Sequence, residues 1–247
     1  MPESVPAVLF IGLVLAFAGF VKGVIGLGLP AIGVGLISLI YAPPEAAALL
    51  VIPNVTTNFW QMLAGRNLVG LLRRLWPLLA GIVLGSALGA WTFGGVASWA
   101  AALLGLALVA YGGLGLAALA PRWRGPGEGV LGAAAGVGTG VLTVITGVSV
   151  MPLVPYLNAI GLDRDQLVQA LGLSFFVSTV GLAAALARSG ILDSAVAGAS
   201  ALALVPVLAG MFAGQAVRQR VSQRGFRRWF FLGLSALGLY LVVRSLL

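Results

Sequence analysis

Residues 19–30 read Gly19-Phe-Val-Lys-Gly-Val-Ile-Gly-Leu-Gly-Leu-Pro30 and include Lys22, the only lysine of the chain. No other charged residue occurs between Ser4 and Pro44. An apolar run of this length predicts membrane-spanning structure, and the glycines and the proline predict a break in it. A cation at membrane depth is costly and usually functional, so this stretch indicates a pathway or a binding site for an anion.

The composition of the whole chain agrees with a location in the membrane. Of its 247 residues, 60% are hydrophobic and 8% are charged, and the mean hydropathy is +1.10. These values exclude an ordinary soluble globular protein. The first residues lack the positive region of a cleavable signal peptide, so we expect the first apolar segment to remain. The sequence therefore predicts an all-α polytopic membrane protein.

Glycines, prolines and charges divide the chain into ten apolar segments, which predict about eight to ten transmembrane helices. The first two segments, like the sixth and seventh, are short and broken by glycine, so each pair forms two short spans or a re-entrant hairpin. The ten segments are 5–22, 27–41, 45–65, 75–92, 96–120, 129–145, 148–161, 166–187, 194–216 and 229–246.

Two halves of the chain resemble each other in the order of their glycine motifs. Pro77-x3-Gly81-x3-Gly85 recurs as Pro206-x3-Gly210-x3-Gly214, and Ala18-Gly19-x3-Gly23 recurs as Ala135-Gly136-x3-Gly140. Internal repeats of this kind are typical of secondary transporters. We predict a first repeat over 1–120, a connecting loop over 121–128 and a second repeat over 129–247.

The distribution of arginine predicts how the two repeats are oriented. If each broken pair crosses the membrane an even number of times, one side holds eleven arginines and the other holds two, Arg188 and Arg244. If each pair crosses once, the sides hold seven and six. The positive-inside rule favours the first arrangement. It predicts inverted repeats with both chain termini outside.

The two breaks, Gly23 to Pro30 and Gly138 to Pro152, predict a binding site near the middle of the membrane. Half-helix ends there expose backbone N–H groups and positive dipoles, which attract anions. Small and hydroxyl residues also serve ordinary helix packing in membranes, so that interpretation stays open. The candidate binding residues in the breaks are Gly26, Gly28, Thr143, Thr146 and Ser149.

The third apolar segment contains a polar stripe, since Asn54, Thr57, Asn58 and Gln61 follow helical spacing. Asn and Gln side chains can donate to an oxyanion without adding permanent charge. Their alternative role is to hold helices together, and Lys22 could extend to the far interface instead of binding cargo. The corresponding polar residues of the second half are Gln169, Ser174 and Ser178.

Several functional classes are excluded by what the chain lacks. There is no cysteine or histidine, which removes disulfides and the usual ligands of zinc, haem and iron–sulfur clusters. No Walker motif or catalytic Ser/His pair occurs, so we expect neither an ATPase nor another enzyme, and no cofactor or metal. The arginines lie in short loops and indicate topology, not nucleic-acid binding. The acidic residues all fall at predicted segment ends: Glu3, Glu45, Glu128, Asp163, Asp165 and Asp193.

The motifs resemble those of the sulfite exporter TauE/SafE permease family over essentially the whole chain. They are the break ending at Pro30, Pro43-Pro-Glu-Ala46, Ile52-Pro-Asn-Val-Thr-Thr-Asn-Phe-Trp-Gln61, Gln169-Ala-Leu-Gly172 and the repeated Pro-x3-Gly-x3-Gly. The resemblance implies a multi-pass transporter of sulfur-containing anions in the bacterial inner membrane. The family commonly has a run of glycines in each break, whereas this chain has Gly26-Leu-Gly28 and Gly147-Val-Ser149. That departure leaves the substrate open.

The leading hypothesis is a secondary transporter or facilitator for sulfite or an organosulfonate that works by alternating access. Lys22 would attract the anion, and Asn54, Asn58 and Gln61 would orient it. The alternatives are an anion channel and a membrane assembly subunit without cargo. Glycine-rich surfaces such as residues 105–115 pack either within the chain or against a second copy in a homo-oligomer.

Overall fold

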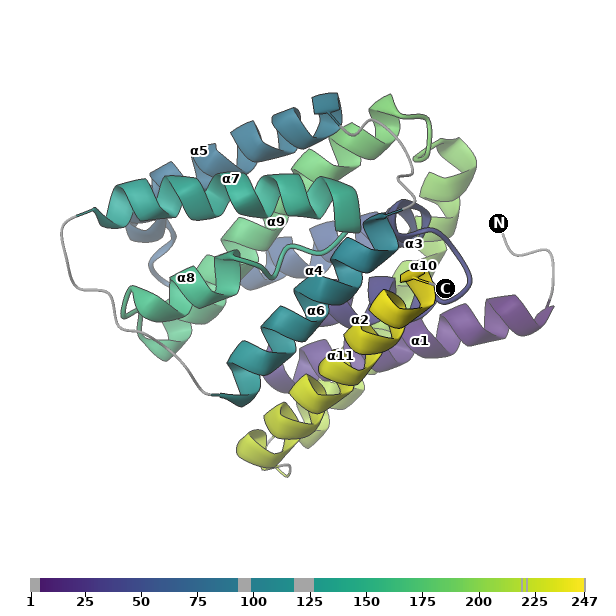
Figure 1. The fold of residues 1–247 in the computed structure, drawn as a ribbon. Helices are drawn as coiled ribbons and strands as arrows, with labels where there is room; N and C mark the ends of the chain where they lie inside the picture. The colour runs from purple at the N-terminus through teal and green to yellow at the C-terminus, as the bar shows by residue number, and fades with distance from the viewer. Residues whose placement is uncertain (1–4, 93–98, 118–126, 219, 221, 247) are drawn as a thin grey trace.

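The computed structural model describes residues 5–92, 99–117, 127–218, 220 and 222–246. All regular structure in these ranges is helical, which confirms the predicted all-α class (Figure 1). The helices are α1 (Val5–Ile25), α2 (Leu29–Ile37), α3 (Pro43–Leu49), α4 (Val51–Leu63), α5 (Leu68–Thr92), α6 (Ala100–Leu116), α7 (Glu128–Thr146), α8 (Leu153–Ala159), α9 (Arg164–Arg188), α10 (Ser194–Val217) and α11 (Gln223–Leu246).

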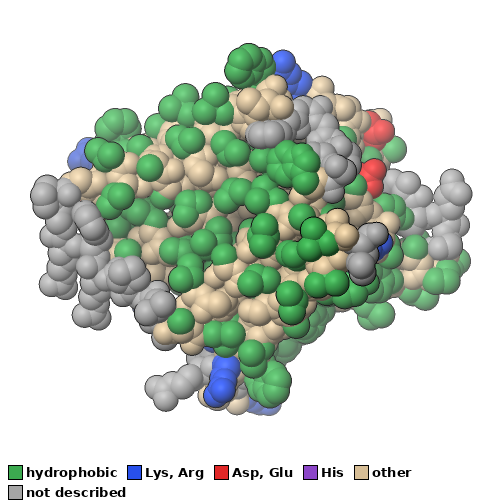
Figure 2. All heavy atoms as spheres, in the orientation of Figure 1, with side chains coloured by type: hydrophobic (Ala, Val, Ile, Leu, Met, Phe, Trp, Pro, Cys, Tyr) green, Lys and Arg blue, Asp and Glu red, His purple; other side chains and the backbone are tan. Residues whose placement is uncertain are grey.

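Six helices of the described chain are long and apolar enough to cross a membrane: α1, α5, α7, α9, α10 and α11. Helix α6 is also apolar but is shorter, with 17 described residues. The outer surface matches a lipid environment, because Trp60, Leu202 and many other large apolar side chains are exposed. Figure 2 shows apolar side chains over the face and charged ones near the edges of the view. The chain is a multi-pass membrane protein.

Glycine sets the first break inside the predicted stretch of Gly23 to Pro30, although the helix continues through Gly23 and the break is limited to residues 26–28. Helix α1 ends at Ile25, and Gly26 and Gly28 have φ of 81° and 104°, a region that favours glycine because it has no Cβ atom. Gly28 is then the N-cap of α2, with Pro30 in the first turn. This proline suits a helix start because the N–H that it lacks has no partner there.

The second break is shorter than predicted. Helix α7 continues through Gly138 as far as Thr146, so the non-helical part begins at Gly147, which has φ of 74°. The predicted start was wrong because glycine is tolerated inside a membrane helix that a neighbouring helix packs against. Gly136 and Gly140, on either side of Gly138, face the backbone of α5.

The single segment predicted over 45–65 is two helices, α3 and α4. Pro53 lies in the first turn of α4, where it has no N–H to bond to the carbonyl of Leu49 at the end of α3. The N–H of Ile52 donates instead to the Ser200 hydroxyl in α10, at 3.0 Å. A hydroxyl from another helix therefore satisfies a donor released by the break.

Helices α5 and α11 begin six or seven residues earlier than the predicted segments at 75 and 229. Their early turns contain arginines, including Arg73, Arg74 and Arg227. Arginine is a good helix former, and its long side chain can reach the interface from a helix end. Counting only apolar residues therefore placed both helix starts too late.

The glycine motifs of one half pack against those of the other half. Helix α5 lies along α7, and α1 lies along α10 (Figure 1). A Cβ atom built on Gly136 would lie 2.9 Å from Cα of Gly81, and one built on Gly214 would lie 3.1 Å from Cα of Gly23. These helices can approach so closely because both backbones lack side chains at the crossing. Each half thus supplies one member of both pairs.

Two further helix pairs also join the halves. Helices α6 and α11 lie side by side (Figure 1), with Gly105 against Gly238 and Gly112 against Ser235. Helices α4 and α9 pack on each other as well. Most of the glycine-rich surface at residues 105–115 is therefore used within the chain. The inverted orientation and the boundaries of the repeats stay predictions.

Candidate functional site

Lys22 is buried in the last turn of α1, one turn before Gly26, with 5% of its surface exposed. Its Nζ atom donates a hydrogen bond to Thr57 Oγ1 at 3.0 Å and another to Asn58 Oδ1. Both partners lie in α4. The side chain therefore points into the protein and does not extend to the far interface.

The partners of Lys22 are neutral. In the part of the chain that the structure describes, the single ion pair joins Arg74 to Glu128, with 41% and 31% of the side chains exposed. The described acidic residues lie at helix starts, where Asp163 and Asp193 cap α9 and α10. Burial removes the hydration of the Lys22 ammonium. The dipoles of its two neutral partners replace only part of that stabilisation, because no carboxylate is paired with it. The described hydrogen-bond partners of Lys22 therefore supply no negative charge to balance it.

Three of the four residues of the predicted polar stripe on α4 are buried, namely Asn54, Thr57 and Asn58. Thr57 accepts from Lys22 and donates its own proton to the carbonyl of Pro53 at 2.7 Å. Asn54 lies one turn before Asn58 on the same face, and its Oδ1 has no partner. No hydrogen bond between described residues uses the Nδ2 of Asn54 or Asn58. Two amide donors of α4 thus remain unused, one of them on the Asn58 side chain that bonds Lys22.

Gln61 and Gln169 hold α4 and α9 together. Gln61 Nε2 donates to the carbonyl of Val168 at 2.9 Å, and Gln169 Nε2 donates to that of Met62 at 2.8 Å. Gln169 Oε1 also accepts from the N–H of Asn67 at 3.1 Å. Both amides are satisfied by backbone of the facing segment, which matches the alternative role in helix packing.

The hydroxyls of the second half mainly bond to their own helices. Thr143 and Thr146 each donate to the carbonyl four residues earlier, at 2.6 and 2.7 Å, and Ser178 donates to the carbonyl of Ser174 at 2.9 Å. Ser149 is buried in the break, and Ser174 Oγ is buried without a partner. Among the described residues, no hydrogen bond joins this group to Lys22.

Backbone N–H groups lack hydrogen-bond partners among the described residues at both breaks. In the first break, none of the hydrogen bonds found among the described residues uses the N–H of Leu27, Gly28, Leu29 or Ala31. These groups precede and open α2, where the helix dipole adds partial positive charge. In the second break, the unused N–H groups are those of Ser149, Val150 and Met151.

An arginine holds the C-terminal end of each short helix. Arg74 in α5 donates to the carbonyl of Ile160, the C-cap of α8, at 2.8 Å and pairs with Glu128. Arg244 in α11 donates to the carbonyl of Leu39, just after α2, at 2.6 Å. A cation at a helix C-terminus complements the negative end of the dipole. The C-terminal ends of α2 and α8 are thus each bonded to an arginine, and a glycine with positive φ, Gly28 or Gly147, precedes each helix in the chain.

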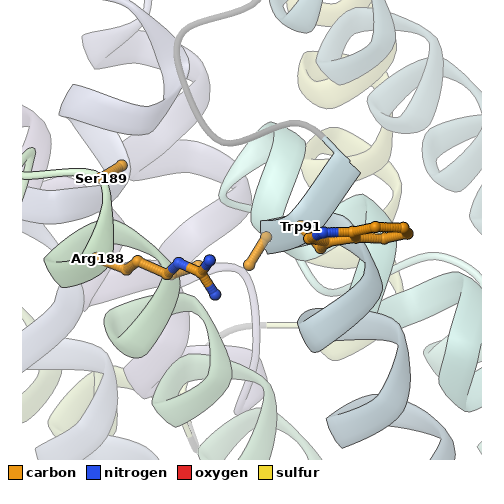
Figure 3. A pocket seen from close by; sticks show the side chains of 5 residues that line it. Trp91, Arg188 and Ser189 are labelled. Carbon is orange, nitrogen blue, oxygen red and sulfur yellow. The ribbon is translucent and has the colours of Figure 1, made fainter.

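A separate surface cavity of about 240 Å³ lies between the ends of α5 and α9 (Figure 3). Its lining includes Trp91, Arg188 and Ser189 and shares no residue with the Lys22 cluster. In Figure 3 the Trp91 ring points away from Arg188. We therefore place the candidate site at Lys22 and not at this cavity.

A comparison with protein families gives a match to the model described as Sulfite exporter TauE/SafE, over residues 11–241. The match covers nearly the whole chain. The chain belongs to the TauE/SafE family. TauE/SafE membership and the six long apolar helices make it a membrane transporter protein by class. Neither the comparison with curated proteins nor that with solved structures gives a match.

The match to TauE/SafE confirms the family resemblance found in the motifs, including the Lys22 break and the Asn54–Gln61 segment. Two residues near the breaks were missed. Ser200 was hidden in an apolar segment, and Tyr111 was one aromatic residue in the uncharged run that became α6. A polar atom in the middle of a predicted span was the available signal for both, since such groups need a partner in the membrane.

Proposed function

We propose that this TauE/SafE protein is a secondary carrier that moves a small sulfur oxyanion, sulfite or an organosulfonate, across the bacterial inner membrane. The observation on which the proposal depends is the burial of Lys22 against two neutral side chains, Thr57 and Asn58. The family name supports the sulfur oxyanion as cargo.

The charge of the site favours an anion over a neutral solute. An oxyanion next to Nζ of Lys22 would supply the negative charge that the described neighbours lack, through a charge-assisted hydrogen bond. The unused amide groups of Asn54 and Asn58 lie on the same side of α4 and can donate to further oxygens. Sulfite and sulfonates each present three oxygens, so several donors can bind one anion at once.

The first break adds backbone donors to this side-chain group. Lys22 is four residues from Gly26, whose N–H bonds the carbonyl of Lys22 itself. The next N–H groups, up to Ala31, are unused and lead into α2. We propose that the anion moves between the α4 amides and these N–H groups, because both bind it without a second permanent charge that would slow release.

The arrangement of the broken segments supports alternating access between the halves. Helices α2 and α8 are anchored by Arg244 and Arg74 at their C-terminal ends. Gly28 directly precedes α2, and Gly147 ends α7 six residues before α8 begins, and both glycines allow large changes of backbone angle. We propose that each short helix pivots about its arginine and opens the site to one side of the membrane in turn. The inverted repeats predicted from sequence would place these two movements on opposite sides.

The test is counterflow of radiolabelled sulfite and taurine in proteoliposomes that contain wild-type, Lys22→Met or Lys22→Arg protein. We expect saturable uptake that is stimulated by internal anion, about a tenfold or greater rise in KM for Lys22→Met, and partial retention of uptake in Lys22→Arg. Arg188→Gln is the matched control, because it removes one positive charge at the separate cavity, which shares no residue with the Lys22 cluster, and it should leave KM unchanged.

Other outcomes select the alternatives. Large currents without stimulation by internal anion would indicate a channel. Folded wild-type protein that neither moves nor is stabilised by any anion of a broad panel would favour an assembly subunit and overturn the proposal. Normal kinetics in Lys22→Met, with uptake otherwise intact, would remove Lys22 from the site but leave the carrier function standing.

A further inference from the structure

Tyr111 places a hydroxyl group in the core where it has no hydrogen-bond partner. The residue lies in α6 with 3% of its surface exposed, and its Oη atom is buried and unpaired. Its ring packs edge-on against Phe230 and Phe231 of α11, with centroids 6.4 and 5.3 Å away. These contacts fix the direction of the ring and therefore the position of the hydroxyl.

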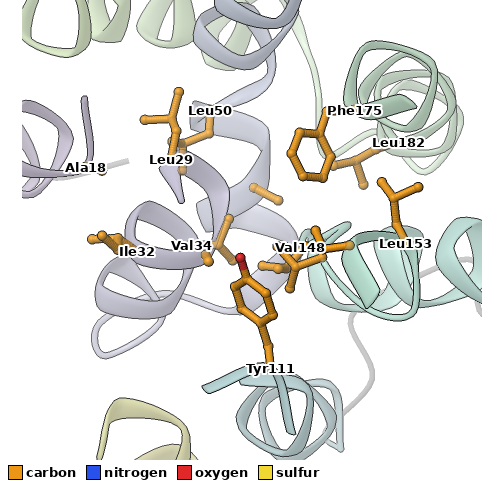
Figure 4. Close-up of a cluster of buried hydrophobic side chains, with 14 of the residues drawn as sticks. Ala18, Leu29, Ile32, Val34, Leu50, Tyr111, Val148, Leu153, Phe175 and Leu182 are labelled. Atoms are coloured by element: carbon orange, nitrogen blue, oxygen red, sulfur yellow. The ribbon is translucent and has the colours of Figure 1, made fainter. Parts of the chain in front are cut away.

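The hydroxyl points to the place where the two broken segments meet. In Figure 4 it is directed between Val34 of α2 and Val148, which follows the Gly147 turn. A Cβ atom built on Gly147 would lie 3.3 Å from Cγ1 of Val34. The first and second halves are thus in direct contact beside the Tyr111 ring, and the unused N–H groups of the second break follow Val148 along the chain.

An unpaired hydroxyl in this position needs a reason, because native proteins satisfy most buried polar groups. Other buried, unpaired hydroxyls in the described chain belong to serines, such as Ser38, Ser86 and Ser235. A serine hydroxyl can turn to a carbonyl of its own helix. The phenol oxygen stands several bonds further from the backbone and cannot do so, so rotation of the Tyr111 side chain does not provide a partner within α6.

We propose that Tyr111 Oη donates a hydrogen bond to the transported oxyanion when the seam between α2 and residues 147–152 opens. This inference rests on the proposed function and adds a donor from α6 to the site. Because the phenol is neutral at physiological pH, it would bind an anion briefly and release it. The apolar neighbours Val34 and Val148 would keep water from competing for the hydroxyl while the seam is closed.

The test compares Tyr111→Phe with wild type in two measurements, sulfite counterflow in proteoliposomes and thermal unfolding in detergent with and without sulfite. The variant removes the oxygen and keeps the ring contacts. We expect an unchanged or higher Tm without anion, a smaller rise of Tm on adding sulfite, and about a tenfold higher KM, the effect of losing one hydrogen bond to a charged group.

Two controls separate a binding role from a structural one. Ser235→Ala removes another buried, unpaired hydroxyl at the α6–α11 contact, and Tyr240→Phe removes an exposed phenol of α11. Both should leave KM unchanged. A lower Tm of Tyr111→Phe with wild-type KM would overturn this inference alone, whereas wild-type protein without any uptake of sulfur oxyanions would overturn the proposed function and this inference together.

Discussion

Lys22 of α1 and Asn58 of α4 form a direct hydrogen bond inside the protein, from the ammonium to the amide oxygen. The two residues are 36 positions apart in sequence. Their contact fixes an unpaired positive charge beside an amide whose nitrogen is unused. An anion site needs both features, and the charge at position 58 can be changed without altering the size of the side chain.

Asn58→Asp should abolish anion binding while the protein still folds. The new carboxylate would pair with Lys22 and take the place of the transported anion, so the site would no longer carry a net positive charge that attracts a ligand. We expect loss of sulfite-dependent stabilisation and of counterflow, with a Tm equal to or above that of wild type. Asn158→Asp, on the exposed surface of α8, is the control and should transport normally. Wild-type affinity in Asn58→Asp would place the anion elsewhere.

Gln169→Leu should lower stability without affecting affinity. The variant loses the hydrogen bonds to the carbonyl of Met62 and the N–H of Asn67. Leaving such groups unpaired costs about 1–3 kcal/mol each when they are fully buried, and less here because Met62 is partly exposed and Asn67 is exposed. Denaturation in detergent and sulfite KM measure the two effects. Gln166→Leu, earlier on the same helix, is the control. A large rise in KM at wild-type stability would instead place Gln169 in the binding site.

Gly210→Ala should destabilise the protein, and Gly198→Ala on the same helix should not. A Cβ atom on Gly210 would lie 2.9 Å from the backbone nitrogen of Phe20, so α1 and α10 must separate. We expect a loss of about 1–3 kcal/mol from this overpacking. Gly198 has open space around it, so alanine there should stabilise the helix by about 0.5–1 kcal/mol. Unfolding midpoints of the pair in one detergent give the comparison. Equal midpoints would argue against the α1–α10 contact.

The predicted topology can be tested by single cysteines, because the chain contains none. Ser222→Cys lies among the arginines before α11, and Ser245→Cys lies near its end. With both termini outside, a membrane-impermeant thiol reagent should label Cys at position 245 in intact cells and Cys at position 222 only after the membrane is opened. The reverse pattern would contradict the orientation predicted from the arginine count.

Much of the fold could be predicted from composition and glycine. The apolar runs predicted most helices within a few residues, and the pair Gly26 and Gly28 marked the first break. The split of residues 45–65 was missed, because Pro53 was read as a member of a polar helix and not as its start. A proline in the first turn of a helix and a proline inside a membrane helix give the same local sequence signal. The two cases are distinguished here by the hydrogen bond from the Ile52 N–H to Ser200, which only the structure shows.

Less of the candidate site could be predicted. Spacing on one helix placed Asn54, Thr57 and Asn58 on one face, but no local pattern states which helix lies opposite. The contact with Lys22 therefore had to come from the structure. For the same reason the sequence assigned Gln61 to the same binding stripe as Asn54 and Asn58, whereas in the structure its side chain bonds the carbonyl of Val168 in α9. Tyr111 was missed because an aromatic residue in an apolar helix is usually core.

The glycine contacts between α5 and α7 and between α1 and α10 also bear on how the chain is made. During synthesis, α1 and α5 enter the membrane before α7 and α10 exist, so their bare backbone grooves first face lipid or each other. The final packing then forms only after Gly210 and Gly214 have emerged, late in the chain. A chain truncated after the first half would therefore lack both packing partners and remain an unfinished bundle. If the two halves are expressed as separate chains, the folded protein should form only when they associate in the bilayer.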